Sequence, residues 1–305
     1  MKKLFLILTV FTLISSAGYA QDTIALLTQK GFFERPQQSY GINSYEGIKR
    51  ILYTHLKYAN DYNFDGLRNL YSDNYTNADG FNKDIYFDLI KKTWEIYPGI
   101  RYKMDIKNIT INSNSAVAQV IESAVATTQS KSGVVDKSGL LESISNSVYY
   151  FENINGDWLI TSDYIISEKT LLRYGSAKDI EIELDAPFQV PADKDYTASF
   201  KIQSPKDSLV IASIGRENIT YPQTIAEEVF RKIKEDGVLE RVFKSNNKNI
   251  NEYAVASFGI TKAEIKNSSE IKISVTGLGF IMSRVNVIPK NGFIKVKDEK
   301  DEKNN

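Results

Sequence analysis

The 305-residue chain has no cysteine and a single histidine, and its 38 lysine and arginine residues balance 38 aspartate and glutamate residues. The lack of thiols excludes disulfides, cysteine nucleophiles and cysteine-ligated clusters, and one histidine leaves few ways to bind zinc. A net charge of zero provides no overall field that would attract nucleic acid. The composition therefore predicts a globular protein with no cofactor, no metal and no nucleic-acid partner.

Long apolar runs are also scarce, and the one that stands out lies at the start of the chain. The basic residues Lys2 and Lys3 precede the apolar run Leu4–Ile14, and the small residues of segment 15–20 follow it. This layout is typical of a signal peptide over residues 1–20 that is cleaved after Ala20. A membrane anchor is the alternative, but eleven apolar residues are too few for a hydrocarbon layer of about 30 Å. We expect an exported bacterial protein, periplasmic or secreted, with no stable membrane span after cleavage.

The pattern after the leader changes from helical to alternating. Residues 21–43 form a mixed lead-in arm, and apolar residues then recur at helical spacing in segments 44–60, 65–71 and 82–97. From residue 102 the apolar residues alternate with polar ones, which indicates strands, and Asn155-Gly156 is a strong signal for a tight hairpin turn. The sequence therefore predicts three helices followed by an antiparallel sheet.

Two segments of this region resemble the nuclear transport factor 2-like superfamily, which includes SnoaL-like polyketide cyclases and ketosteroid isomerases. They are Phe64–Asp73, with the sequence FDGLRNLYSD, and Tyr150–Ile160, with the sequence YFENINGDWLI. The resemblance covers about residues 44 to 172. It implies an α+β domain over residues 44–173, in which a curved antiparallel sheet forms a cone over three helices.

The second half of the chain reads as mostly strands. Seven short apolar runs separated by Asp, Asn, Gly and Pro clusters predict an immunoglobulin-like β-sandwich over residues 176–290. One helix is expected inside it, from the capping box Thr224–Glu227 to Gly237. The glycines of Thr276–Gly279 favour a β-bulge over a phosphate loop. The charged tail 291–305 is expected to be disordered.

The superfamily resemblance also implies positions for a proton-transfer site. It places Asp79 where ketosteroid isomerases carry the general base, His55 where they carry an oxyanion tyrosine, and Ser147 where they carry a protonated acid. The residues themselves allow simpler interpretations. His55 lies on the apolar face of a predicted helix, which suits a buried structural histidine. Asp79 lies in Asn77–Gly80, a typical turn sequence.

Aromatic residues of the strands and of the third helix are candidates for lining a pocket, although such residues more often form a core. The full set of candidate pocket residues is His55, Asp79, Trp94, Tyr102, Ser147, Tyr149 and Trp158. The loop Asp79–Asp84 lacks the spacing of a calcium loop and contains a lysine, so no metal is expected there.

Three functions remain open at this point. The favoured one is an exported two-domain binding protein, whose cone domain holds a small apolar ligand or an envelope protein and whose sandwich domain serves in docking or adhesion. Catalysis is not expected, because two of the three implied catalytic positions carry the wrong residue. The second is an isomerase, cyclase or dehydratase that uses Asp79 as general base. The third is an envelope scaffold that forms a homodimer through the sheet of the N-terminal domain.

Overall fold

The computed structural model describes residues 45–132, 134–135, 138–223, 228–234, 236–267 and 270–290. The predicted signal peptide, the lead-in arm and the charged tail lie outside these residues. Among the helices of the described residues, none has both the length and the apolar character needed to cross a membrane.

Three α-helices lie close to the predicted segments: α2 (Tyr45–Asn60), α3 (Phe64–Arg68) and α4 (Lys83–Ile96). The Asn82 side chain caps α4 by accepting a hydrogen bond from a backbone N–H of its first turn. The apolar residues Ile48, Leu52, Leu56 and Ala59 of α2 are buried, and His55 is buried among them. The helical spacing thus identified the face of α2 that packs on the sheet.

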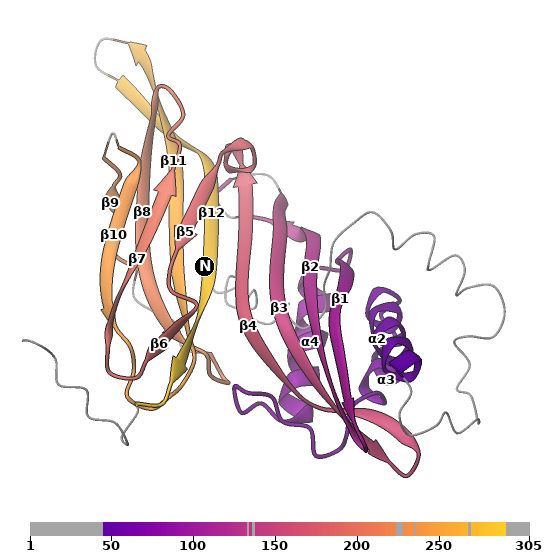
Figure 1. Cartoon of the computed structure of the whole chain (residues 1–305). Helices are drawn as coiled ribbons and strands as arrows, with labels where there is room; N and C mark the ends of the chain where they lie inside the picture. The colour runs from indigo at the N-terminus through magenta and orange to yellow at the C-terminus, as the bar shows by residue number, and fades with distance from the viewer. Residues whose placement is uncertain are drawn as a thin grey trace, which may run out of the picture.

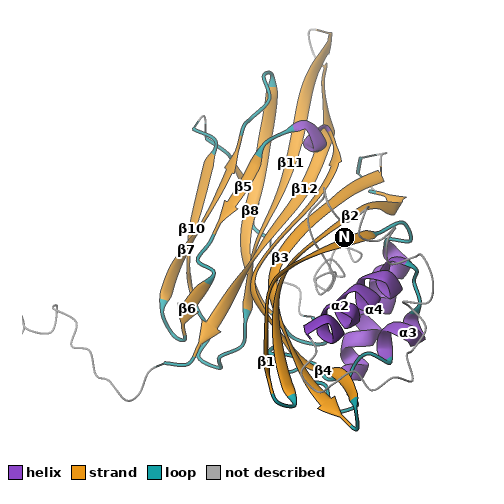
Figure 2. Cartoon of the chain, turned by 45° about the vertical axis from the view of Figure 1, so that its right-hand side comes forward, coloured by secondary structure: helices purple, strands orange, loops and turns teal. Residues whose placement is uncertain are grey.

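Four long strands follow and form an antiparallel meander that curves around the helices (Figure 2). They are β1 (Arg101–Asn112), β2 (Ser115–Lys131), β3 (Ser138–Ile154) and β4 (Asp157–Gly175). Asn155 and Gly156 join β3 to β4 with φ values of 56° and 98°. Both values lie in the left-handed region that a two-residue type I′ hairpin requires, so the predicted turn is confirmed.

The sheet does not end at the predicted boundary between the two domains. Strand β4 pairs with the last strand of the chain, from Gly175 opposite Gly277 to Lys169 opposite Ser283. The sheet then continues in the order β12, β11, β8, β9, with β6 beside β12 (Figure 1). Its further members are β6 (Gln189–Pro191), β8 (Ser208–Asn218), β9 (Arg231–Lys232), β11 (Glu252–Asn267) and β12 (Glu270–Ile288). One nine-stranded sheet therefore runs through both parts of the chain.

A second, three-stranded sheet covers one face of the C-terminal part of the large sheet. It consists of β5 (Ile182–Asp185), β7 (Asp195–Ile202) and β10 (Val238–Lys244), and the 3-10 helix η2 (Ser176–Asp179) leads into it from β4. The two layers share a buried core in which the rings of Phe200 and Phe258 lie 5.4 Å apart.

Two features of the C-terminal half test the sequence interpretation. The predicted helix beginning at Thr224 is wrong where the chain is described, because residues 228–234 are not helical and β9 pairs with β8. Val229 N donates to Ser213 Oγ and Ile233 N donates to the Val210 carbonyl, so the edge of β8 satisfies this backbone. Residues 224–227 lie outside the described part.

The bulge predicted in Thr276–Gly279 is confirmed at Thr276, which is the extra residue opposite Ile260 and Thr261.

Candidate functional site

Small hydroxyl side chains line the middle of the sheet face that meets the helices. Ser143, Ser145 and Ser147 alternate along β3 and are all buried. Ser145 pairs with Glu122 of β2 on one side and with Glu168 of β4 on the other. Both glutamates are buried, so this face carries acids and hydroxyls where a core made only for packing would be apolar.

Two bulges in β4 turn acidic residues toward the helices. Thr161 and Ile166 are extra residues opposite β3, and each shifts the alternation of β4 by one position. Asp163 and Glu168 lie two positions after these bulges, and both are buried. A strict alternation from Trp158 would point Asp163 away from the helices, which is why the sequence did not reveal it.

His55 lies at the centre of a cluster of buried aromatic side chains. Its Nε2 atom lies 2.7 Å from the hydroxyl of Tyr71, which lies 3.2 Å from the hydroxyl of Tyr86. The ring of Tyr149 approaches the imidazole edge-on at 5.7 Å. The other ring nitrogen, Nδ1, is buried and has no hydrogen-bond partner within the described part of the chain. Burial lowers the pKa of His55 to about 3, so the imidazole is neutral at physiological pH.

Two acids border this cluster and are bonded by its tyrosines. The hydroxyl of Tyr149 donates to Glu122 Oε1 at 3.0 Å, and the hydroxyl of Tyr75 donates to Asp163 Oδ2. Burial raises the pKa of Asp163 to about 7, although the bond from Tyr75 opposes the shift. Burial likewise raises the pKa of the cluster tyrosines well above the usual value. The cluster therefore holds hydrogen-bonding groups that are mostly uncharged.

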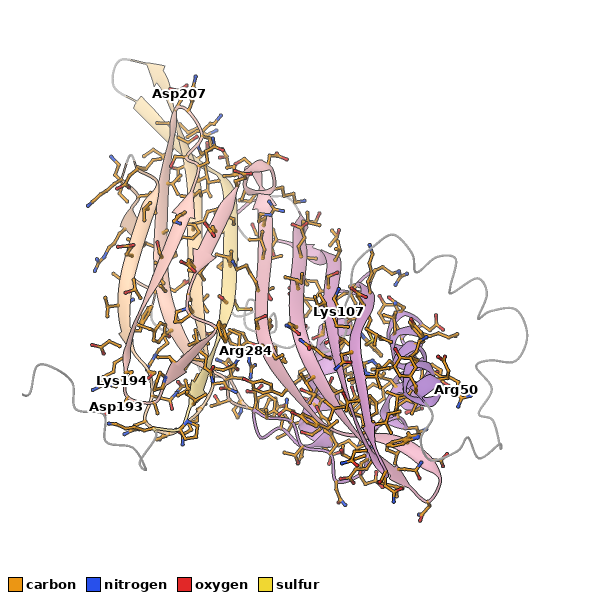
Figure 3. All side chains as sticks on the ribbon, viewed as in Figure 1. Arg50, Lys107, Asp193, Lys194, Asp207 and Arg284 are labelled. Carbon is orange, nitrogen blue, oxygen red and sulfur yellow. The ribbon has the colours of Figure 1, made fainter. Side chains whose placement is uncertain are left out.

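The C-terminal strands contribute to the same buried face. Tyr253 of β11 donates to Glu168 Oε2 at 2.7 Å, while Oε1 of Glu168 is buried and none of the described residues forms a hydrogen bond with it. Burial raises the pKa of Glu168 to about 8, and the nearby charge of Arg284 partly offsets this rise. Arg284 of β12 lies at the junction between the two parts of the molecule (Figure 3). Both parts of the chain thus supply polar groups to this region.

Asp79 belongs to this junction and does not contact His55. Arg284 holds its carboxylate with two hydrogen bonds, Nη2 to Oδ1 at 2.6 Å and Nη1 to Oδ2 at 3.1 Å. Asn251 donates a third bond to Oδ1 at 2.8 Å. The backbone around Asp79 forms a turn that the side chain of Asn77 stabilises. Both carboxylate oxygens of Asp79 are therefore occupied by donors from the C-terminal part of the chain.

The remaining candidate residues lie in separate places. Trp94 donates through Nε1 to the hydroxyl of Tyr102 at 3.1 Å, at the start of β1. Ser147 lies 3.2 Å from the hydroxyl of Ser145. Trp158 is buried on β4, and its ring nitrogen has no hydrogen-bond partner in the described ranges of the chain. Of the predicted set, His55 and Tyr149 are in ring contact, whereas Asp79 lies with Arg284 and Trp94 with Tyr102.

The sequence interpretation overlooked most of the acids and tyrosines of the cluster. Tyr71, Tyr75 and Tyr86 fall in segments where aromatic residues are common, so nothing in their spacing distinguished them. Glu122 could have been found, because it continues the buried alternation of Ala116, Ala118 and Val120. Three acids that the sequence analysis did not single out, Glu122, Asp163 and Glu168, are buried on this face.

No family model and no curated protein matches the chain. Similar solved structures include a putative scytalone dehydratase from Novosphingobium aromaticivorans, at 13% identity and a TM-score of 0.33, covering 39% of this chain and 80% of that one. A nuclear transport factor 2-like superfamily protein from Salmonella enterica has 11% identity and a TM-score of 0.32, with coverages of 39% and 87%. A similar protein from Cytophaga hutchinsonii has 13% identity and a TM-score of 0.28, with coverages of 40% and 97%.

Each of these structures covers about two-fifths of this chain. At these identities and TM-scores, the comparisons say nothing about what this chain binds or converts.

Proposed function

We propose that residues 45–175 form a cone-shaped binding domain for a small, uncharged and largely apolar molecule. The observation that carries the proposal is the buried Nδ1 atom of His55, which has no hydrogen-bond partner among the residues that the structure describes. A buried polar atom left in this state typically costs about 1–3 kcal/mol. A ligand hydroxyl or carbonyl bonded at Nδ1 would recover that free energy.

The charge state of the cluster supports an uncharged ligand. His55 is neutral at physiological pH, Glu168 keeps its proton up to about pH 8, and the tyrosines remain protonated. A charged ligand would lose its hydration without gaining an opposite charge from these groups. The aromatic rings around His55 offer apolar contact to a flat molecule.

Binding of naphthol and of naphthalene sulfonate, followed by fluorescence, tests this proposal. We expect naphthol to bind and its charged analogue to bind at least tenfold more weakly. His55→Phe should weaken naphthol binding by about tenfold through the lost hydrogen bond. Lys49→Gln, on the same helix but away from the cluster, should leave binding unchanged. Equal binding of the two compounds, or binding that is insensitive to His55→Phe, would refute the proposal.

A second candidate is an enzyme that transfers a proton next to a carbonyl, with Asp163 as the acid–base group. Its raised pKa of about 7 favours this role, because a general base works best when its pKa is near the working pH. Exchange of the α-hydrogens of cyclohexanone in D₂O, followed by NMR, provides the test. Asp163→Asn should abolish the exchange, while Asp157→Asn, in the exposed β3–β4 hairpin, should not change it. If the wild type shows no exchange with this ketone, the binding function stands alone.

In the same proposal, residues 176–290 form a sandwich domain that docks the protein in the cell envelope after export. Its two β layers and the leader-like start of the sequence support this role. Fractionation of cells that express the full chain tests it, since the mature protein should be found outside the inner membrane. A homodimer remains the alternative for the outer sheet face, where Val125, Ile144 and Tyr150 are exposed. Tyr102 and Tyr149 do not contribute to that face, because both are buried.

A further inference from the structure

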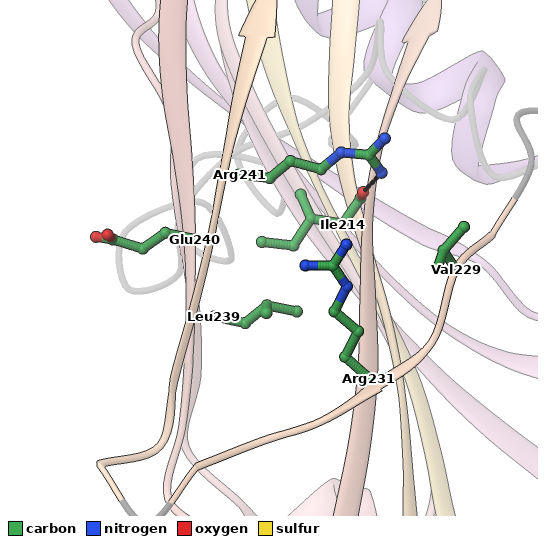
Figure 4. Close-up of a pocket in the computed structure, with 6 residues that line it drawn as sticks. All are labelled: Ile214, Val229, Arg231, Leu239, Glu240 and Arg241. Carbon is green, nitrogen blue, oxygen red and sulfur yellow. Dashed lines mark hydrogen bonds between the residues drawn. The ribbon is translucent and has the colours of Figure 1, made fainter.

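A separate pocket of about 90 Å³ opens between the two β layers of the C-terminal part. It lies where β10, at the edge of the small sheet, faces β8 and β9, at the edge of the large sheet. Its lining residues are Ile214, Val229, Arg231, Leu239, Glu240 and Arg241 (Figure 4). None of these residues takes part in the cluster around His55.

The register of β9 directs Arg231 into this pocket. Arg231 pairs with Ala212 of β8, and Ala212 is buried between the layers together with Val210 and Ile214. Paired residues point to the same face of a sheet, so Arg231 points between the layers. Lys232 pairs with Ile211 and points to the opposite face. Two adjacent basic residues thus have different environments.

Arg241 approaches the same space from the other sheet. It pairs with the buried Ala198 of β7 and alternates with Leu239 and Phe243 on the inner face of β10. Its guanidinium lies 5.1 Å from the centre of the Phe243 ring and donates through Nη1 to the Ile214 carbonyl at 2.6 Å. These contacts hold the guanidinium at the rim of the pocket.

The charges in the pocket are not balanced among the described residues. Both guanidinium groups extend toward Ile214, whereas the carboxylate of Glu240 points away from them (Figure 4). The Arg231 guanidinium makes no ion pair or hydrogen bond within the described part of the chain. Two cations that face the same small volume repel each other, and an anion between them would remove this repulsion.

We propose that this pocket binds a small carboxylate that carries an apolar tail. The planar guanidinium forms paired hydrogen bonds with a carboxylate, and the space between Arg231 and Arg241 is where such a group would sit. Ile214, Leu239 and Val229 supply apolar contact for the tail. The pocket volume suits a carboxylate with a short chain or a single ring.

A structural role is the competing explanation for these arginines. Charged side chains that point inward at a sheet edge prevent edge-to-edge pairing between molecules, and arginine stems can cover an apolar core. That role requires no ligand. It predicts that substitution of Arg231 alters association or stability, whereas the binding role predicts a change in carboxylate affinity in a folded monomer.

Calorimetric titration of the full chain with benzoate, and with benzamide as the uncharged analogue, separates the two roles. We expect benzoate to bind and benzamide to bind at least tenfold more weakly. Arg231→Gln should weaken benzoate binding by about tenfold, as loss of one charge-assisted pair implies. Lys232→Gln removes the same charge one residue away on the other face of β9, and it should leave the affinity unchanged.

The proposal would be overturned by a lack of benzoate binding, by equal binding of benzamide, or by equal losses of affinity from Arg231→Gln and Lys232→Gln. Inorganic phosphate that binds as tightly as benzoate would also overturn it, because the apolar walls would then contribute nothing. Thermal unfolding of Arg231→Gln verifies that the variant is folded. The side chain is exposed and makes no hydrogen bond within the described chain, so little change is expected.

Discussion

At the scale of single residues, His55 makes the stability of the protein sensitive to acid. Its pKa is about 3 in the folded chain, against an ordinary value of 6.5. Between these values the unfolded chain binds a proton that the folded chain excludes. The free energy of unfolding contributed by His55 is therefore present above pH 6.5 and is lost as the pH falls toward 3.

His55→Gln should remove this dependence. We expect the free energy of unfolding of the wild type to fall between pH 6.5 and pH 4 by about 1.4 kcal/mol per pH unit more than that of the variant. Urea unfolding at several pH values measures the difference. Because His55 is the one histidine in the chain, no other imidazole can mask the result. If the free energies of unfolding of the two proteins depended on pH in the same way, the pH dependence assigned to His55 would be contradicted.

Asp163 gives a dependence of the opposite sign. Its pKa of about 7 exceeds the ordinary 3.8, so the folded chain keeps a proton that the unfolded chain releases. The free energy of unfolding should therefore decline as the pH rises from about 4 to about 7. Glu168 extends the decline toward pH 8 for the same reason.

Asp163→Asn should stabilise the protein at alkaline pH. The amide can still accept the hydrogen bond from Tyr75 and does not ionise, so the variant avoids a buried charge. The full shift corresponds to a gain of up to about 4 kcal/mol at pH 8 and almost none at pH 4. Denaturant unfolding at the two pH values tests this, with the exposed Asp157→Asn as a control that should follow the wild type. A variant less stable than the wild type at pH 8 would show that the ionised carboxylate is favourable there.

At the scale of elements, the two bulges of β4 decide which side chains face the helices. Deletion of Thr161 should restore a regular ladder and reverse the face of every residue on one side of the deletion. We expect either a loss of folding or a shift of the bulge along the strand, with destabilisation of several kcal/mol. Thr161→Ala keeps the number of residues in β4 and should lower the free energy of unfolding only slightly. Comparison of the two variants therefore separates the effect of the extra backbone residue from that of the threonine side chain. Equal stability of the deletion and Thr161→Ala would show that the bulge is not required.

The same elements show how far the sequence predicts the structure. Helical spacing located α4, and Asn155-Gly156 located the hairpin, because both signals are local. The bulges at Thr161 and Ile166 have no such signal, since they arise from pairing with β3. Because a bulge shifts the alternation of β4 by one position, Asp163 was missed as a site residue. The segment around Arg231 has helical spacing of apolar residues, but it pairs with the edge of β8 and forms the strand β9.

At the scale of the whole molecule, the continuous sheet predicts that both parts unfold together. The pairing of β4 with β12 joins residues about a hundred positions apart, which no local pattern could reveal. Both tryptophans, Trp94 and Trp158, lie in the N-terminal part, whereas strands of both parts contribute to circular dichroism. We expect coincident urea transitions by tryptophan fluorescence and by circular dichroism. A fluorescence transition clearly separated from the dichroism transition would show that the parts unfold independently.

The pair formed by Arg284 and Asp79 adds a buried contact to this joint. Its side chains are 1% and 6% exposed, and removal of one partner from such a pair typically costs about 3–5 kcal/mol. Asp79→Asn should therefore lower the free energy of unfolding by several kcal/mol. Asp84→Asn, whose carboxylate is 81% exposed in its pair with Arg68, should lower it by less than about 1 kcal/mol. Comparable losses of unfolding free energy in the two variants would show that the buried pair contributes no more to stability than the exposed pair.

The seam between β4 and β12 also has a mechanical meaning. Backbone hydrogen bonds across it leave no free linker about which the two parts could swing. If one end of the molecule is tethered, the other end is presented at a fixed angle, and a pull on the C-terminal hairpin is passed sideways into the strands that carry Asp163 and Glu168. The two parts are therefore expected to move as one rigid body, unlike two domains joined by a flexible linker.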